Sequence, residues 1–321
     1  MLLITACSTI PPAGEPESGL ILRSISDLYP VTSPDIPAML PRWRQVDGAG
    51  EIAAFAGRIR KPRLEFWALR VVLNYAAPES GEPDARTWEE PEQRILIGAG
   101  EENGILRFGH TASTRVSSFV RNNGLTAAIN TVPFEPSSAL EGEDRTVVGL
   151  GVSNGRLIAP PEPRFDALVF YRDGRAAIVG QWELCAADGD DGSGVPPEIL
   201  HATGGFHCIL RNGELTGWAR RKSPRYARSA AGLSADGRTL YLIAINGGRL
   251  TNRGATEAET ALLLKQLGAE DALNLDGGGS SALVLRFPAD GVTVLNTPVH
   301  AGLPGRERAV ALCLGIGLPR L

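Results

Sequence analysis

The sequence predicts an α+β fold made mostly of antiparallel β-sheet, with a few helices, in a single large domain. Short apolar runs are separated by pairs such as Asn154-Gly155 and Asp173-Gly174, which are typical of the turns that join antiparallel strands. Only residues 256–267 have a clear helical pattern. There are therefore too few helices for a fold of alternating strands and helices.

The chain divides into three parts. Residues 1–20 form an N-terminus and tether, residues 21–50 an irregular lead-in, and residues 51–321 the domain itself. Four prolines in the lead-in exclude a long helix or a central strand there. A chain of 321 residues is long enough to bury a large core.

The first half of the domain contains few strong signals. Residues 66–73 are predicted to form a strand, and the acidic, proline-rich residues 78–93 a long surface loop. Residues 117–121 favour a short helical turn. The apolar residues 125–129 then predict a strand that ends at Asn130.

The second half has clearer patterns. One strand is predicted within residues 206–215, ending in the turn at Asn212-Gly213, and another over residues 239–245. The helix at 256–267 begins with Thr256 and Glu259 at the spacing of a capping box, and a glycine follows its end.

The chain is organised around residues 272–285, ALNLDGGGSSALVL. Two apolar strands flank a turn that carries one carboxylate, three glycines and two hydroxyls. Glycines adopt positive φ and let a ligand approach the backbone N–H groups, which suits an anion. No lysine follows the glycines, so the turn is not a mononucleotide-binding P-loop. The alternative is a tight hairpin in which Asp276 and Ser280 only bond the turn.

The run NLDGGGSS resembles the signature of the phosphodiester glycosidase family, which includes the enzyme that uncovers mannose 6-phosphate. Further motifs follow in the order found in that family, namely SSFVRNNGLTAAIN, ATGGFHCILRNGEL, RSAAGLSADGRTLYLIAING, RGATEAETALLLKQLGAEDALNLDGGGSS, VLNTP and RERAVALCLGI. The resemblance covers roughly residues 52–317. It implies hydrolysis of a sugar-1-phosphodiester at the anomeric C–O bond, without a cofactor.

The resemblance also suggests roles for individual residues. Asp276 would face the anomeric centre as nucleophile or base. The phosphate would be held by the turn and by arginines, and the expected ligands are Gly277, Gly278, Gly279, Ser280, Ser281, Arg228, Arg249 and Arg308. Arg228 matches the Arg of the Arg-Thr-Ala motif of the family. For each arginine taken singly, a surface salt bridge is an equally good interpretation.

Three further candidates have structural alternatives. Asn130 matches an Asn of the family and would bond a sugar hydroxyl or a phosphate oxygen, or else cap a turn. Asn246 stands where the family usually has Asp, so an acid/base role there is in doubt. Glu259 would face the ligand or serve only the capping box. The repeated AIN ending at Asn130 and Asn246 suggests two related half-sheets that bring both amides to one cleft.

Charge and spacing exclude other classes of function. The net charge of −4 gives no basic surface for nucleic acid. The loop at 188–194, DGDDGSG, lacks the spacing of an EF-hand, and His201 and His207 lack a standard ligand spacing, so no metal is expected. A metal-dependent phosphodiesterase would need a ligand cluster that the sequence does not offer.

The N-terminus resembles a bacterial lipobox, LITAC, in which Cys7 would be lipidated after removal of a signal peptide whose start lies further upstream. A ragged N-terminus is the alternative. Lipidation would place the protein in the cell envelope, with the anchor as its membrane contact. A Cys185–Cys208 disulfide is conceivable, although Cys208 and Cys313 fit buried thiols better. A non-catalytic envelope lipoprotein that binds glycan phosphates stays open as a second function.

Overall fold

The structure is a computed structural model. It describes side chains and backbone for residues 51–60, 62–74, 93–99, 104–138, 140–184, 195–250, 252–287 and 291–318, and the backbone alone for residues 31–33, 36–39, 42–47 and 185. Cys7, the tether and the loops at 78–92 and 188–194 lie outside these residues.

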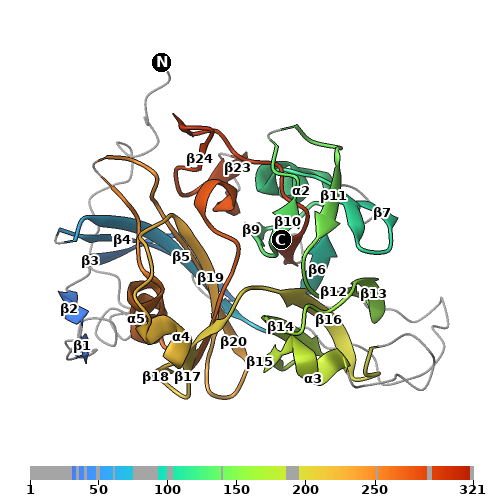
Figure 1. Cartoon of the computed structure of the whole chain (residues 1–321), viewed down its shortest axis with the longest axis horizontal. Coiled ribbons are helices and arrows are strands. Elements are labelled where there is room, and N and C mark those ends of the chain that lie inside the picture. Colours follow the sequence, from blue (N-terminus) through green and yellow to red (C-terminus); the bar gives the residue numbers. More distant parts are fainter. Residues whose placement is uncertain are drawn as a thin grey trace.

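An eight-stranded antiparallel sheet, the central sheet, is the largest element of the fold (Figure 1). Its strands in spatial order are β18 (Glu214–Leu215), β17 (Cys208–Arg211), β21 (Asp271–Asn274), β19 (Arg228–Leu233), β20 (Thr239–Ile245), β5 (Leu64–Val72), β4 (Ile52–Ile59) and β3 (Arg42–Asp47). β3 is an edge strand that pairs with β4 inside the segment for which the sequence predicts irregular structure. That part of the prediction is wrong, because an edge strand tolerates prolines nearby.

A five-stranded antiparallel sheet, the second sheet, packs against the central sheet. Its order is β23 (Gly291–Val294), β22 (Leu283–Phe287), β9 (Ala127–Asn130), β26 (Cys313–Gly317) and β6 (Arg94–Gly98). The strands predicted on both sides of the glycine turn therefore belong to different sheets, β21 to the central sheet and β22 to the second sheet. The turn crosses from one layer to the other.

The remaining strands form smaller sheets. A third sheet contains β13 (Arg156–Ala159), β12 (Gly151–Ser153), β16 (Ile199–Gly204), β14 (Asp166–Tyr171) and β15 (Ala176–Gly180), and a fourth contains β10 (Phe134–Glu135), β11 (Asp144–Val147), β8 (His110–Ala112) and β7 (Ile105–Arg107). Two hairpins pair β1 (Val31–Ser33) with β2 (Ile36–Met39) and β24 (Val299–His300) with β25 (Leu303–Pro304). The predicted hairpin turns at Asn154-Gly155 and Asn212-Gly213 are confirmed, with positive φ at all four residues.

The apolar run of β20 explains why the central sheet has two covered faces. Leu240, Leu242 and Ala244 enter the core shared with the second sheet. Tyr241, Ile243 and Ile245 alternate with them and enter a core shared with the helix α5. A strand buried on both faces is continuously apolar rather than alternating, which is what the sequence of β20 shows.

Helices cover the outer faces of the two large sheets. α5 (Glu257–Leu267) and α4 (Gly217–Arg220) lie on the central sheet, and α2 (Val116–Asn122) lies on the second sheet (Figure 1). α3 (Gln181–Cys185) is a short helix that follows β15. The predicted capping box of α5 is confirmed, and Gly268 ends the helix with φ of 110°. The fold is thus α+β and mostly antiparallel, as predicted.

Cys208 and Cys313 are buried free thiols, as predicted. The side chain of Cys185, the suggested partner of Cys208, lies outside the described residues. Within the described part of the chain, no helix has the length and hydropathy that crossing a membrane requires.

Candidate active site

The glycine turn between β21 and β22 is tied by its backbone to the ends of two other strands. Asp276 N donates to Thr131 O, just after β9, at 2.7 Å. Gly278 N donates to Ala227 O, just before β19, at 2.8 Å. The short 3₁₀ helix η2 (Gly278–Ser280) follows, with Gly278 at φ of 60°. The turn therefore lies where the ends of β9, β19 and β21 meet.

The side-chain amide of Asn130, at the end of β9, forms hydrogen bonds with the backbone of this turn. Its Nδ2 donates to Asp276 O at 2.6 Å, and its Oδ1 accepts from Ser229 Oγ at 2.7 Å and from Ala282 N at 3.1 Å. Asn130 is fully buried. The amide thus lies beside Asp276 as the sequence suggests, but it is occupied by the protein and supports the backbone of the turn.

The Asp276 carboxyl group is the centre of the candidate site. Burial raises its pKa to about 6, although hydrogen bonds from Ser280 and Gly277 N and the positive charge of Arg308 oppose that rise. A carboxyl with this pKa is mostly ionised near neutral pH and exchanges its proton in mildly acidic solution. Such a shift in a carboxyl group that also has a serine hydroxyl and an arginine beside it is typical of functional carboxyls.

Arg308 reaches the turn from the loop before β26. Its Nη1 donates to Ser280 Oγ at 3.2 Å and its Nε donates to His300 Nδ1 at 3.1 Å. The guanidinium lies close to Gly279, where a Cβ atom would be 2.5 Å from Nη2. Only glycine permits this approach. Arg308 is therefore the arginine that the structure brings to Asp276 and Ser280.

The residue before it, Glu307, anchors this arginine. Its carboxylate accepts from Ser117 N at 3.2 Å and from Ser117 Oγ at 2.5 Å, at the start of α2. Burial raises the pKa of Glu307, and the two bonds from Ser117 oppose the rise. The loop that presents Arg308 is thus fastened to the helix that covers the second sheet.

Two other glycines pack, like Gly277, against the backbone at Tyr226 and Ala227. A Cβ on Gly247 would be 2.2 Å from Ala227 N, one on Gly254 1.9 Å from Tyr226 O, and one on Gly277 2.8 Å from Ala227 O. These are impossible contacts with main-chain atoms, which have no freedom to move aside. The segment after β20 is therefore pressed against the same short backbone as the glycine turn.

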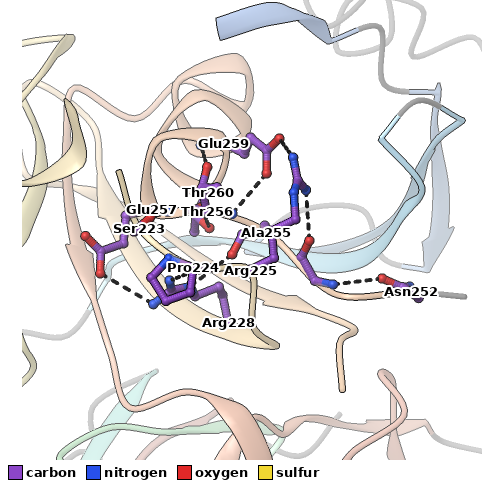
Figure 2. A network of polar contacts seen from close by, with 11 residues as sticks. Ser223, Pro224, Arg225, Arg228, Asn252, Ala255, Thr256, Glu257, Glu259 and Thr260 are labelled. Atoms are coloured by element: carbon purple, nitrogen blue, oxygen red, sulfur yellow. Dashed lines mark hydrogen bonds and ion pairs between the residues drawn. The ribbon is translucent and has the colours of Figure 1, made fainter. Parts of the chain in front are cut away.

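Arg228 lies on the other side of the central sheet. Successive side chains of a strand point to opposite faces, so Ser229 bonds Asn130 while Arg228 points toward α5. Its guanidinium donates to Pro224 O at 3.0 Å and to Ala255 O at 3.2 Å, and pairs with Glu257 at 3.4 Å (Figure 2). The backbone of Arg228 thus lies near the turn, whereas its guanidinium contacts residues at and before the start of α5.

Glu259 belongs to the same network. It accepts from Thr256 N at 2.9 Å in the capping box and pairs with Arg225 (Figure 2). Its side chain is almost fully buried. The structure therefore gives Glu259 the capping role that was the alternative to a catalytic one.

Asn246 and Arg249 follow β20. Asn246 Oδ1 accepts from Thr297 N at 2.8 Å, and its Nδ2 lies 3.5 Å from Glu65 Oε2. This amide anchors the VLNTP segment, whose Asn296 in turn bonds Ser281 O and Leu283 N. Both predicted asparagines thus support the flanks of the turn, Asn130 directly and Asn246 through the segment 296–297.

Two predicted ligands have unused polar atoms. Arg249 Nε and Ser281 Oγ are buried and have no hydrogen-bond partner among the described residues. Ser281 is fully buried, so its hydroxyl faces the interior of the turn rather than an open surface. Contact of either residue with a substrate stays a prediction.

The sequence reasoning missed three residues of the site. Ser229 and Thr131 each contact the turn from a neighbouring strand, and His300 accepts from Arg308. Ser229 could have been predicted from the alternation along β19, because the neighbours Arg228 and Ser229 point to opposite faces of the sheet. No local pattern marks His300.

Metal-ligating side chains do not gather here. Among the described residues, no three His, Cys, Asp or Glu side chains come close enough to hold a metal ion. His201 is buried and accepts from Asn154 N at 3.3 Å, whereas His207 stacks on Trp218 with ring centroids 3.6 Å apart. The two histidines that suggested a metal therefore have separate partners.

Comparison with known proteins assigns the family. The profile of the phosphodiester glycosidase family (NAGPA) matches residues 123–317, more than half of the chain. The chain therefore belongs to the phosphodiester glycosidase family. A curated relative, the SPbeta prophage-derived uncharacterized protein YomE of Bacillus subtilis (strain 168), is 28% identical over 227 residues, which are 66% of this chain and 31% of that protein. The chain thus spans less than a third of the length of this relative.

Solved structures share the fold. The catalytic domain of zebrafish N-acetylglucosamine-1-phosphodiester alpha-N-acetylglucosaminidase, auto-inhibited by its pro-peptide, superimposes with a TM-score of 0.54 at 16% identity, over 92% of this chain and 93% of that chain. A hypothetical protein from Synechocystis gives 0.57 at 14% identity, over 89% of this chain and 64% of that chain. At these identities the likeness shows the fold, and membership of the family supports phosphodiester glycosidase activity in general.

Proposed function

We propose that the protein hydrolyses a sugar-1-phosphodiester at its anomeric C–O bond, releasing free sugar and a phosphomonoester. The observation that carries this proposal is the cluster that Asp276 and Ser280 of the glycine turn form with Arg308 from the loop before β26. It combines a carboxyl group of raised pKa with a cationic donor for an oxyanion. Membership of the phosphodiester glycosidase family supports the same reaction.

The phosphate is assigned to the side of the turn that faces Arg308. Gly278 N–H is bonded to Ala227 O, and Gly277 N–H to the Asp276 carboxyl group. The Ser280 hydroxyl donates to the Asp276 carboxyl group as well. Gly279 N–H and the Arg308 guanidinium are then the donors for phosphate oxygens. This is a narrower set than the sequence suggests. Donors placed where charge develops stabilise the transition state most.

Asp276 is assigned to the anomeric carbon. Because a phosphomonoester is a far better leaving group than a sugar alkoxide, the reaction needs little general-acid assistance. One carboxylate then suffices, either as nucleophile or as base for the attacking water. The bond from anomeric carbon to phosphate oxygen breaks with its electron pair on the phosphate, and water supplies the new hydroxyl on the sugar.

The cellular context of this reaction is a separate proposal. The lipobox-like sequence ending at Cys7 supports an exported protein anchored in the cell envelope, with envelope or exported glycan phosphates as substrates. Metabolic labelling of Cys7 with a fatty-acid analogue in a bacterial host, compared with Cys7→Ser, tests the anchor independently of the enzyme activity.

The activity is tested by measuring free sugar released from a small panel of sugar-1-phosphodiesters. Asp276→Asn should abolish turnover while phosphodiester binding, measured by calorimetry, is largely kept, because the amide preserves shape. Wild-type protein that binds these ligands and releases no sugar would favour the alternative, a non-catalytic lipoprotein that binds phosphorylated glycans.

A further inference from the structure

His300 is held in one tautomer by the arginine of the candidate site. Arg308 Nε donates to His300 Nδ1 at 3.1 Å, so this ring nitrogen carries no proton. In a neutral imidazole the proton is then on Nε2. That N–H has no acceptor among the residues that the structure describes.

The surroundings of the ring keep it neutral. Partial burial lowers the pKa of His300, and the positive charges of Arg308 and Arg306 lower it further. No carboxylate of the described residues forms an ion pair with the ring. His300 therefore presents a neutral N–H donor next to a cation whose other end reaches Ser280.

The hairpin that carries His300 lies against the glycine turn. β24 packs on η2, and His300 pairs with Leu303 of β25. The chain reverses through Ala301 at φ of 53° and Gly302 at φ of 76°. The imidazole is partly buried, whereas Leu303 beside it is exposed. The ring is thus partly exposed and lies on a hairpin that packs on the glycine turn.

We infer that His300 donates a hydrogen bond from Nε2 to an oxygen of the substrate phosphate, so that Arg308 and His300 together hold the departing phosphomonoester. This inference rests on the proposed function and adds a phosphate ligand to it. The contact strengthens as the C–O bond breaks, because negative charge accumulates on the phosphate oxygens. His300 transfers no proton in this scheme.

The test compares two substrates of the same sugar, a phosphodiester and a 2,4-dinitrophenyl glycoside. His300→Phe keeps a planar ring and removes both nitrogens. It should lower kcat/KM for the phosphodiester about 10- to 100-fold, the usual effect of losing a hydrogen bond to a charged group. The dinitrophenyl glycoside, whose leaving group has no phosphate, should be affected less than threefold. His300→Gln keeps an acceptor for Arg308 and a donor, so it should restore most of the lost rate.

Leu303→Ala is the matched control, since it alters the exposed partner strand of the same hairpin. It should leave both substrates unaffected. Equal losses on the two substrates with His300→Phe would show a structural role and overturn the inference, and so would an unchanged rate on the phosphodiester.

Binding separates this inference from the proposed function. In the Asp276→Asn background, His300→Phe should weaken phosphodiester binding in calorimetry. Should wild-type protein fail to hydrolyse any phosphodiester, the proposed function falls, but weaker binding by His300→Phe would still support the phosphate contact. Unchanged binding would overturn it.

Discussion

Replacing Asn130 should disconnect the glycine turn from the two sheets that it joins. The buried amide makes three hydrogen bonds, to Asp276 O, Ser229 Oγ and Ala282 N. Asn130→Ala leaves all three groups without a partner. A buried polar group that loses its partner costs about 1–3 kcal/mol. The Ser229 hydroxyl can rotate toward another acceptor, so we expect a loss of about 4 kcal/mol in the free energy of unfolding.

Asn130→Asp makes this cost depend on pH. The ionised carboxylate still accepts from Ser229 and Ala282 but faces the Asp276 carbonyl oxygen, to which the amide donates at 2.6 Å. The protonated form donates there as the amide does. Burial and this contact raise the folded-state pKa of the new carboxyl above its unfolded value of about 4. Its stabilising contribution is therefore present below about pH 4 and is lost as pH rises through the folded-state pKa.

Urea unfolding of wild type and both variants, at steps from pH 4.5 to 8, measures these effects. In the difference in unfolding free energy between variant and wild type, the contributions of the other titrating groups cancel, because both proteins share them. For Asn130→Asp this difference should grow with pH by about 1.4 kcal/mol for each unit of pKa elevation. A difference independent of pH, or a cost below about 1 kcal/mol for Asn130→Ala, would refute the argument that this amide ties the turn.

Other predictions test protonation and close packing. If Asp276, with a pKa of about 6, acts as nucleophile or base, kcat/KM should fall as pH drops below about 6, whereas a rate that rises there would assign it as an acid. Gly279→Ala should leave the melting temperature nearly unchanged but lower activity roughly 10-fold, because the new Cβ displaces the Arg308 side chain. Gly277→Ala should instead lower the melting temperature, because its Cβ meets a main-chain carbonyl at 2.8 Å. Equal melting temperatures for the two variants would contradict this difference. Burial and then Arg172 lower the pKa of His201 to about 4, so its stabilising contribution is present above the unfolded pKa of about 6.5 and is lost as pH falls toward 4, by up to roughly 3 kcal/mol. His201→Gln should reduce this acid sensitivity in melting measured at pH 7 and 4.5.

The sequence predicted the elements that depend on local signals. The capping box and the following glycine define α5, and the Asn-Gly pairs define two hairpins, because each involves residues within one turn of chain. The strand at β3 was missed, since its edge position is set by pairing with β4 rather than by its own residues. The division into separate sheets depends on contacts between distant segments and has no local signal.

The same distinction applies to the candidate site. The strand-turn-strand pattern around Asp276 was visible, and so was the polar end of β9 at Asn130. The sequence alone did not show which arginine lies beside the turn. Arg228 and Arg308 differ in the face of the sheet and in the loop that carry them, and these positions are set by the fold. Only the alternation along β19 and the approach to Gly279 show that Arg308 is the one beside Ser280.

The position of β6 has a consequence for how the chain folds during synthesis. Within the second sheet β6 is an edge strand, and its hydrogen-bonded neighbour is β26. Residues 94–98 therefore leave the ribosome long before residues 313–317, the only segment that can complete their pairing in this sheet. Pairing across so long a sequence separation is slow. Residues 94–98 therefore remain without their strand partner in this sheet until translation has passed β26.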